Sequence, residues 1–169
     1  MKRWIILMAG ICLLLSGCTK SNIVYGNNNK YDDQYQPVNG IVWEQLWEDF
    51  SEIYADPDIY PFAASVNAGV YPEENVVKFY LLVKEEISGK EASDYATKVV
   101  KGFNDLIAAQ NSAYAPSDVE SYGGYLAQYG IYVMVGPDAT KDDPDTWIIE
   151  DLIPQGEYRP VGGNAWSVE

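Results

Sequence analysis

The strongest constraint on the fold is a stretch in which two alternating runs are separated by a short polar turn. Apolar residues alternate with other residues over 65–71 and again over 77–84, and Pro72-Glu73-Glu74-Asn75 stands between the runs. A period of two is typical of β-strands, and a short turn with Pro and Asn predicts an antiparallel hairpin. One face of this hairpin is wholly apolar. The other keeps Tyr71, Tyr80 and Leu82 among lysines, which is compatible with partial cover.

Two amphipathic helices flank the hairpin in the sequence. Ser88-Gly89-Lys90-Glu91 is a capping box, and the apolar residues that follow at steps of three and four predict a helix over 88–110. Gly102 lies inside it and suggests close packing on the sheet. The same spacing predicts a helix over 42–55, ended by Asp56-Pro57. Its Trp43 and Trp47 fit a packed core stripe better than a sugar platform.

The second half of the chain contains two further predicted strands. Residues 131–135 form an apolar run closed by Gly136-Pro137, and residues 146–152 form another after an Asp-rich loop. Between 111 and 130 a possible cap at Ser117 is followed at once by Gly123-Gly124, so a short helical turn and a loop are expected there. The order α-β-β-α-β-β predicts an α+β two-layer sandwich: a four-stranded, mainly antiparallel sheet with both helices on one face.

The chain begins with a short leader that differs in composition from the rest. Lys2 and Arg3 precede an apolar run from Trp4 to Leu15, and Ser16-Gly17-Cys18 follows. A basic start, an apolar segment of this length and small residues at its end are typical of a secretory signal peptide. The run is too short for a transmembrane helix, which needs about 20 apolar residues.

Leu15-Ser16-Gly17-Cys18 resembles the lipobox of bacterial lipoproteins: Leu, a small residue, Gly or Ala, then Cys. The resemblance covers the first 18 residues, and all four lipobox positions match. It implies cleavage after residue 17, a diacylglycerol thioether on Cys18, and an amino terminus acylated with a fatty acid such as palmitate. Two acyl chains anchor a protein without spanning the bilayer. The expected location is therefore the cell membrane or outer membrane, facing away from the cytoplasm.

The rest of the chain divides into three parts. Residues 18–40 comprise the lipidated cysteine and a polar, Asn-rich tether without periodicity. Residues 41–155 are expected to form a single α+β domain, and the Gly- and Pro-rich residues 156–169 an irregular tail.

The composition excludes several classes of chemistry. The chain has no histidine, and its two cysteines are Cys12 in the leader and Cys18 at the cleavage site. A mature chain without histidine or a free thiol has neither a Ser–His–Asp nor a Cys–His nucleophile, and no His- or Cys-ligated zinc. Lys and Arg number 11 against 25 Asp and Glu, and loss of Lys2 and Arg3 would change the net charge from -14 to -16. Nucleic acid is not an expected partner, because binding it requires clustered cations.

Two candidate sites remain for metal or acid chemistry. The loop before the last predicted strand carries four aspartates that suggest a calcium site, although it lacks the EF-hand pattern and has Lys141 in its middle: Asp138, Asp142, Asp143 and Asp145. Paired carboxylates could serve a cell-envelope hydrolase. Glu150 and Asp151, however, are adjacent in a strand and would point to opposite faces.

Tyrosine is the most prominent remaining feature, with 14 in the chain. Four of them surround the Gly-rich segment before the third strand and are candidate contacts for a protein or glycan: Tyr122, Tyr125, Tyr129 and Tyr132. They could equally pack as half-buried sheet and loop residues. The sequence thus favours a lipid-anchored, non-enzymatic module that binds an envelope protein or glycan. A carboxylate-based hydrolase and a calcium-stabilised structural domain are the alternatives.

Overall fold

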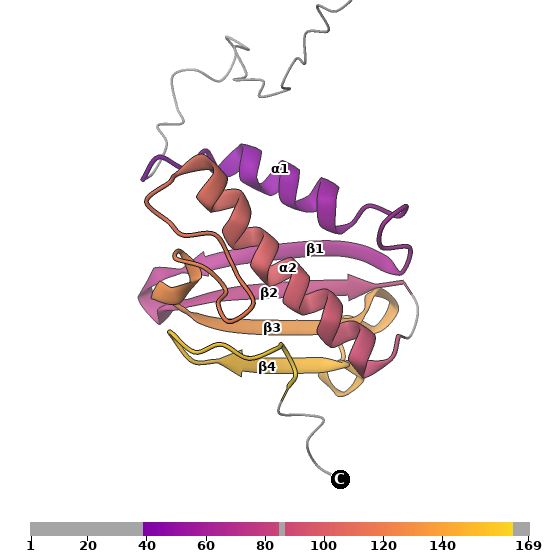
Figure 1. The fold of residues 1–169 in the computed structure, drawn as a ribbon. Helices are drawn as coiled ribbons and strands as arrows, with labels where there is room; N and C mark the ends of the chain where they lie inside the picture. The colour runs from indigo at the N-terminus through magenta and orange to yellow at the C-terminus, as the bar shows by residue number, and fades with distance from the viewer. Residues whose placement is uncertain (1–38, 85–86, 164–169) are drawn as a thin grey trace, which may run out of the picture. The chain divides into compact units, whose positions relative to one another are not determined.

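A computed structural model describes residues 39–84 and 87–163 of the chain (Figure 1). The leader, the lipobox and most of the predicted tether lie outside the described residues, as do 164–169 of the predicted tail. The helices and strands follow in the predicted order, with bounds α1 Trp43–Tyr54, β1 Ala63–Tyr71, β2 Val76–Val83, α2 Gly89–Gln110, β3 Gly130–Pro137 and β4 Ile149–Ile153. The prediction of an α+β fold with two helices and four strands is confirmed.

The strands form one mixed sheet in the order β1-β2-β3-β4. β1 with β2 and β3 with β4 are antiparallel, whereas the central pair β2 and β3 is parallel. Two of the three pairs are therefore antiparallel, as predicted. The parallel pair requires the chain to cross over the sheet between its two strands, and α2 makes this crossover.

The β1–β2 hairpin has the register that its alternation predicts. Phe79 lies opposite Ala68 on one side and Val133 on the other. The connecting turn is a 3₁₀ turn, η1 (Pro72–Glu74), followed by Asn75 in the left-handed conformation with φ 54°. Asparagine tolerates this conformation better than most residues, which explains its place at the end of the turn.

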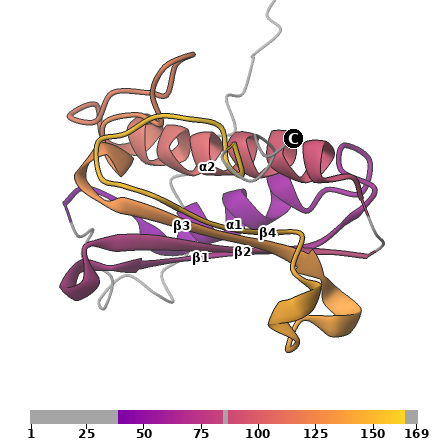
Figure 2. The same cartoon turned by 90° about the horizontal axis from the view of Figure 1, so that it is seen from below.

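The hydrophobic core lies between the helices and one face of the sheet. Figure 2 shows α1 and α2 on the same side of the sheet. Phe50 of α1, Phe79 of β2 and Phe103 of α2 meet there, with the ring centroid of Phe103 5.4 Å from that of Phe50 and 5.3 Å from that of Phe79. Trp43 and Trp47 are half-buried against this core, as their helical stripe predicts.

Helix α2 begins as predicted but packs differently at its glycine. The Ser88 side chain accepts a hydrogen bond from the Glu91 amide at 3.2 Å, which confirms the N-cap. Gly102 lies against Tyr54 of α1, since a Cβ at this position would be 1.5 Å from the Tyr54 hydroxyl oxygen. The close approach suggested by Gly102 is therefore to the other helix and not to the sheet.

The segment between α2 and β3 contains less helix than expected. No helix starts at Ser117. The segment instead has an isolated bridge between Asp118 and Ser121 and the 3₁₀ turn η2 (Leu126–Gln128). Ser117 does not act as a cap because its amide and hydroxyl both donate to Asp105 of α2, at 2.6 and 2.8 Å.

The last strand begins three residues later than predicted. Residues 138–146 contain two 3₁₀ turns, η3 (Asp138–Thr140) and η4 (Pro144–Thr146), so Thr146 ends a turn and does not begin a strand. In the predicted tail, residues 156–163 form no helix or strand. Val161 is nevertheless fully buried: its amide donates to the Thr97 hydroxyl oxygen at 3.0 Å, and its carbonyl accepts from the Ser93 hydroxyl.

Candidate binding surface on the open face of the sheet

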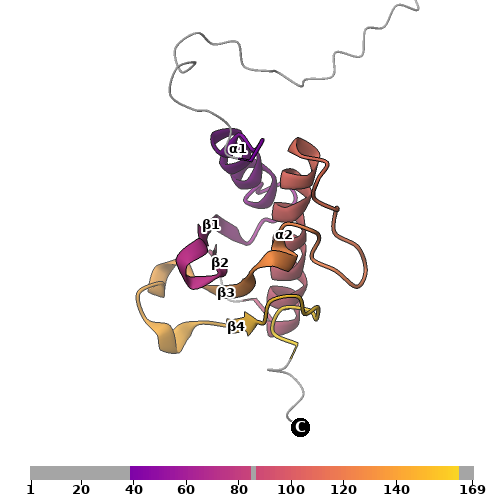
Figure 3. The same ribbon diagram turned by 90° about the vertical axis from the view of Figure 1, so that its left-hand side faces the viewer.

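Neither α1 nor α2 covers the opposite side of the sheet, where, among the described residues, only the segment with η3 and η4 projects beyond the strands (Figures 2 and 3). We call this side the open face and define it by the strand residues that alternate with the buried core positions: Asn67, Gly69, Tyr71, Lys78, Tyr80, Leu82, Tyr132, Met134, Gly136, Glu150 and Leu152. Leu152 is 58% exposed and Tyr71 40% exposed. Partial cover is found at Gly136, which is buried, and at the half-buried positions Gly69, Lys78, Tyr80, Leu82, Tyr132 and Met134.

Lys78 lies on β2 close to the η1 turn, between a carboxylate and an aromatic ring. Its Nζ is 2.6 Å from a Glu74 carboxylate oxygen and 4.5 Å from the centroid of the Tyr71 ring. Gly69 makes this arrangement possible, because a Cβ there would lie 2.8 Å from an atom of the Tyr71 ring. The hydrogen bond to Glu74 raises the pKa of Lys78, so the ammonium is the stable form.

Tyr132 and Glu150 form a second polar pair on the open face, on neighbouring strands. The Tyr132 hydroxyl donates to the Glu150 carboxylate. This bond, followed by burial, raises the pKa of Tyr132 to about 12, so the hydroxyl remains a neutral donor. Glu150 itself is exposed.

A shallow, open groove of about 630 Å³ runs beside these pairs, from the η1 turn across β3 to the end of β4. Glu74, Lys78 and Tyr132 contribute its polar lining and Leu152 an apolar part. The Asn75 side chain donates to the Gln155 side chain at 2.9 Å and joins the two ends of the groove lining. Aromatic rings, carboxylates and amides thus share one accessible surface.

The Asp-rich segment 138–146 lies on the open-face side of the sheet, where it projects beyond the strands (Figure 2). Trp147 follows it and packs on Gly136 of the open face, since a Cβ at Gly136 would be 2.9 Å from the indole. Asp138 is 3.6 Å from the Lys141 ammonium, and Asp143 caps η4 by accepting from the Asp145 amide at 3.2 Å. Two of the four predicted calcium ligands, Asp138 and Asp143, therefore have carboxylates engaged within the segment itself.

Within residues 39–84 and 87–163, no group of three or more Asp, Glu, Cys or His side chains is arranged to hold a metal ion. All four predicted ligands are exposed: Asp138, Asp142, Asp143 and Asp145. The calcium hypothesis thus gains no ligand set from the described part of the chain.

The predicted tyrosine cluster does not form one surface. Tyr122 and Tyr125 are only 3% and 5% exposed, so both belong to the core and not to a contact surface. The Tyr122 hydroxyl donates to the Arg159 carbonyl at 2.7 Å, and the Tyr125 ring packs on Phe103 and Trp43. Burial raises the pKa of both phenols. Tyr129 is half-buried beside Tyr125, and of the four only Tyr132 lies on the open face.

A polar contact that sequence reasoning missed explains this burial. Asn104 of α2 is fully buried, and its side-chain amide donates to the Ala115 carbonyl at 3.0 Å while its oxygen accepts from the Tyr125 amide at 3.0 Å. Gly123 has φ +94°, and a Cβ there would be 1.9 Å from the Asn104 amide nitrogen. The Gly123-Gly124 pair was the signal that a chain segment approaches this closely.

A second missed contact holds the C-terminal segment. The two terminal guanidinium nitrogens of Arg159 donate to the two Asp151 carboxylate oxygens at 2.5 and 2.6 Å, and the Gly162 amide donates to the same carboxylate at 2.6 Å. We call Asp151, Arg159 and Gly162 the tail clamp. Burial alone would raise the pKa of Asp151, but the hydrogen bonds from Arg159 and Gly162 hold that pKa below its ordinary value.

The tail clamp also bears on acid–base chemistry. Asp151 faces the helix side and is bound to Arg159, whereas Glu150 lies on the open face with Tyr132. The two acids thus point to opposite faces, as strand alternation predicts, and do not act as a pair.

Among residues 39–84 and 87–163, no helix combines the length and the hydropathy needed to cross a membrane. Comparisons of the chain with protein-family models, with curated proteins and with solved structures found no match.

Proposed function

We propose that this protein is a lipid-anchored, non-enzymatic module outside the cytoplasm that binds a partner of the cell envelope through the open face of its sheet. The observation that carries the proposal is the open face itself, with its exposed Tyr71 and Leu152 and its groove beside Lys78 and Tyr132. Tyrosines beside charged and apolar groups are typical of protein recognition surfaces.

The anchor is supported by the sequence alone. Leu15-Ser16-Gly17-Cys18 matches the lipobox at each position, and a polar tether follows it. A coil of about 20 residues has an r.m.s. span of roughly 25 Å. The domain would therefore meet partners near the membrane without lying on it.

We further propose that the domain is a two-layer α+β sandwich. The helices lie on one side of the sheet in Figure 2, and their apolar stripes meet the buried sheet positions in a single core. This arrangement supports the proposed function because it leaves the second face of the sheet to a partner.

The binding face is tested by photo-crosslinking in cells. A photoreactive residue replaces Leu152 or Asn67 on the open face, or Glu48 on α1 as the control, since all three side chains are exposed. A defined adduct is expected from the open-face positions and not from Glu48. Adducts from Glu48 alone would place the binding surface elsewhere and end the proposal. Variants of Tyr122 and Tyr125 are unsuitable probes, because they would disturb the core.

The anchor is tested separately by labelling cells with a radioactive fatty acid. The natural chain is expected to incorporate the label and to sediment with membranes. Cys18→Ser is expected to lose both properties. Membrane association that persists unchanged in the variant would contradict lipidation at Cys18.

A further inference from the structure

We propose that the open face binds a basic, extended polypeptide segment. The Lys or Arg side chains of that segment lie between the tyrosine rings and the carboxylates of the open face. The inference rests on the proposed function and names the chemistry of the partner. It follows from the charge of the open face, from the contacts of Lys78, and from the shape of the groove.

The open face is bordered by acidic turns at both of its ends: η1 adjoins the groove, and the segment 138–146 follows β3 at the opposite end of the strands. Seven carboxylates stand against three lysines in these segments and directly after β2, namely Lys78, Lys84 and Lys141; the acids are Glu73, Glu74, Asp138, Asp142, Asp143, Asp145 and Glu150. Lys78 is paired with Glu74 and Lys141 lies near Asp138, so the remaining carboxylates have no lysine of these segments beside them. Charge complementarity therefore favours a cationic partner and opposes anionic polymers.

Lys78 shows how this surface holds a cationic side chain. Its ammonium lies between the Glu74 carboxylate and the Tyr71 ring, at 2.6 Å and 4.5 Å. A carboxylate and an aromatic face together attract a cation by ion pairing and by the ring quadrupole. Tyr132 and Glu150 place the same two group types together on the neighbouring strands, and Glu150 is exposed.

The shape of the site favours a polypeptide over a compact cation. The groove is open, has a volume of about 630 Å³ and is bordered by Leu152 as well as by polar groups. An extended chain can place alternate side chains along it. A second copy of this protein is a poor occupant, because the chain carries a net charge of -14 and two open faces would bring like charges together.

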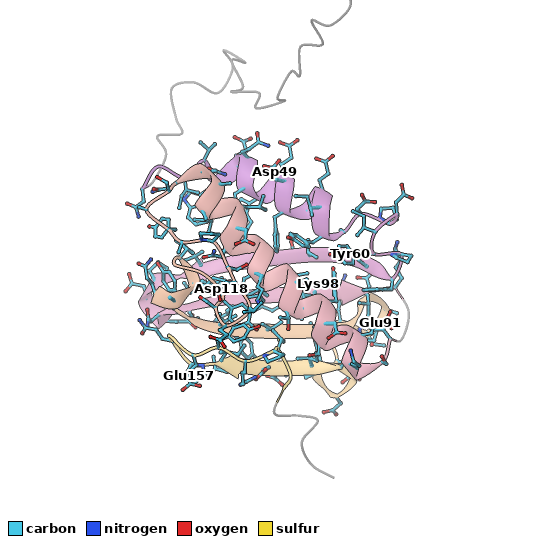
Figure 4. All side chains as sticks on the ribbon, viewed as in Figure 1. Asp49, Tyr60, Glu91, Lys98, Asp118 and Glu157 are labelled. Carbon is cyan, nitrogen blue, oxygen red and sulfur yellow. The ribbon has the colours of Figure 1, made fainter. Side chains whose placement is uncertain are left out.

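Acidic side chains also occur on the helix side, so the test needs a matched control. Figure 4 shows that side, with Asp49 of α1 and Glu91 of α2 labelled. The test compares two double variants. One combines Glu74→Gln and Glu150→Gln on the open face, and the other combines Glu48→Gln and Glu52→Gln on α1. Each removes two negative charges from exposed positions, so the net charge is the same.

The probe is a fluorescent peptide of alternating arginine and serine, titrated with the full-length chain in detergent and followed by fluorescence anisotropy. The open-face variant loses two proposed ion pairs with the peptide and is expected to weaken binding by about tenfold, since each exposed ion pair contributes only modestly. The α1 variant loses no such pair and is expected to weaken binding by less than about twofold. A Tyr71→Leu variant is expected to weaken binding further at unchanged charge. A peptide with glutamate in place of arginine is expected not to bind.

Equal losses in both double variants, or no binding of the arginine peptide, would overturn the inference. Tyrosine-dependent binding of a neutral chitin oligosaccharide at the open face, without binding of the arginine peptide, would overturn it in favour of a glycan. In that case, crosslinks from Leu152 would still support the proposed function. Crosslinks from Glu48 alone would reject both.

Discussion

Replacement of Arg159 by alanine is expected to destabilise the domain by releasing the tail clamp. The side chains of Asp151 and Arg159 are only 12% and 19% exposed, and Arg159 binds both carboxylate oxygens. Removing one partner of a buried ion pair costs about 3–5 kcal/mol, because the other charge remains without its counterion. Asp151 keeps the Gly162 amide as a donor, so we expect a loss of about 2–3 kcal/mol in the free energy of unfolding.

Urea denaturation followed by tryptophan fluorescence measures this loss. The midpoint should fall while the slope of the transition stays nearly unchanged, since the same surface unfolds. The matched control is the double variant Asp151→Leu with Arg159→Met, which removes both charges and is expected to cost less than Arg159→Ala alone. A loss below about 0.5 kcal/mol for Arg159→Ala would refute the role of the tail clamp.

The tail clamp also predicts an acid dependence with a defined sign. The folded-state pKa of Asp151 is lowered, so its contribution is fully present above the unfolded-state pKa of about 3.9. The contribution is lost as the pH falls through the folded-state pKa. Arg159→Ala should therefore flatten the acid limb of the stability profile, and an unchanged limb would contradict this assignment.

Three further predictions concern the helix contact, the phenols and the Asp-rich loop. Gly102→Ala should lower the thermal midpoint, although alanine favours a helix, because the new Cβ would meet the Tyr54 hydroxyl; a raised midpoint would contradict the contact. The pKa of Tyr54 is raised to about 12, so its contribution to stability should be fully present below the unfolded-state pKa of about 10 and should be lost as the pH rises toward 12. Unfolding should accompany the rise in tyrosinate absorbance. Titration of Tyr54 at its ordinary pKa without unfolding would refute the burial of its hydroxyl. Removal of divalent cations with EDTA should leave the thermal midpoint unchanged, and a clear decrease would favour calcium binding by the segment 138–146.

Some residues of the proposed binding surface are predictable from the sequence, and some of its contacts are not. Tyr71, Tyr80 and Leu82 were seen to share the less apolar face of the hairpin, because alternation assigns faces without tertiary information. The clamp of Lys78 between Glu74 and Tyr71 was not foreseen, since it depends on the bend of the turn and on the space left by Gly69. Tyr132 lies on the open face, but not as part of the predicted tyrosine cluster, because Tyr122 and Tyr125 are buried in the core.

Local pattern was sufficient wherever neighbouring residues decide the conformation. The cap at Ser88, the alternation of β1 and β2, and the order of helices and strands depend on contacts within a few residues, and all are confirmed. Tertiary structure alone decided the parallel pairing of β2 with β3 and the burial of Tyr122 and Tyr125. Both depend on the position of α2 over the sheet. In that position Asn104 forms hydrogen bonds with the loop before β3, and Gly102 packs against α1. Such contacts join residues far apart in the chain, and no short-range pattern records them.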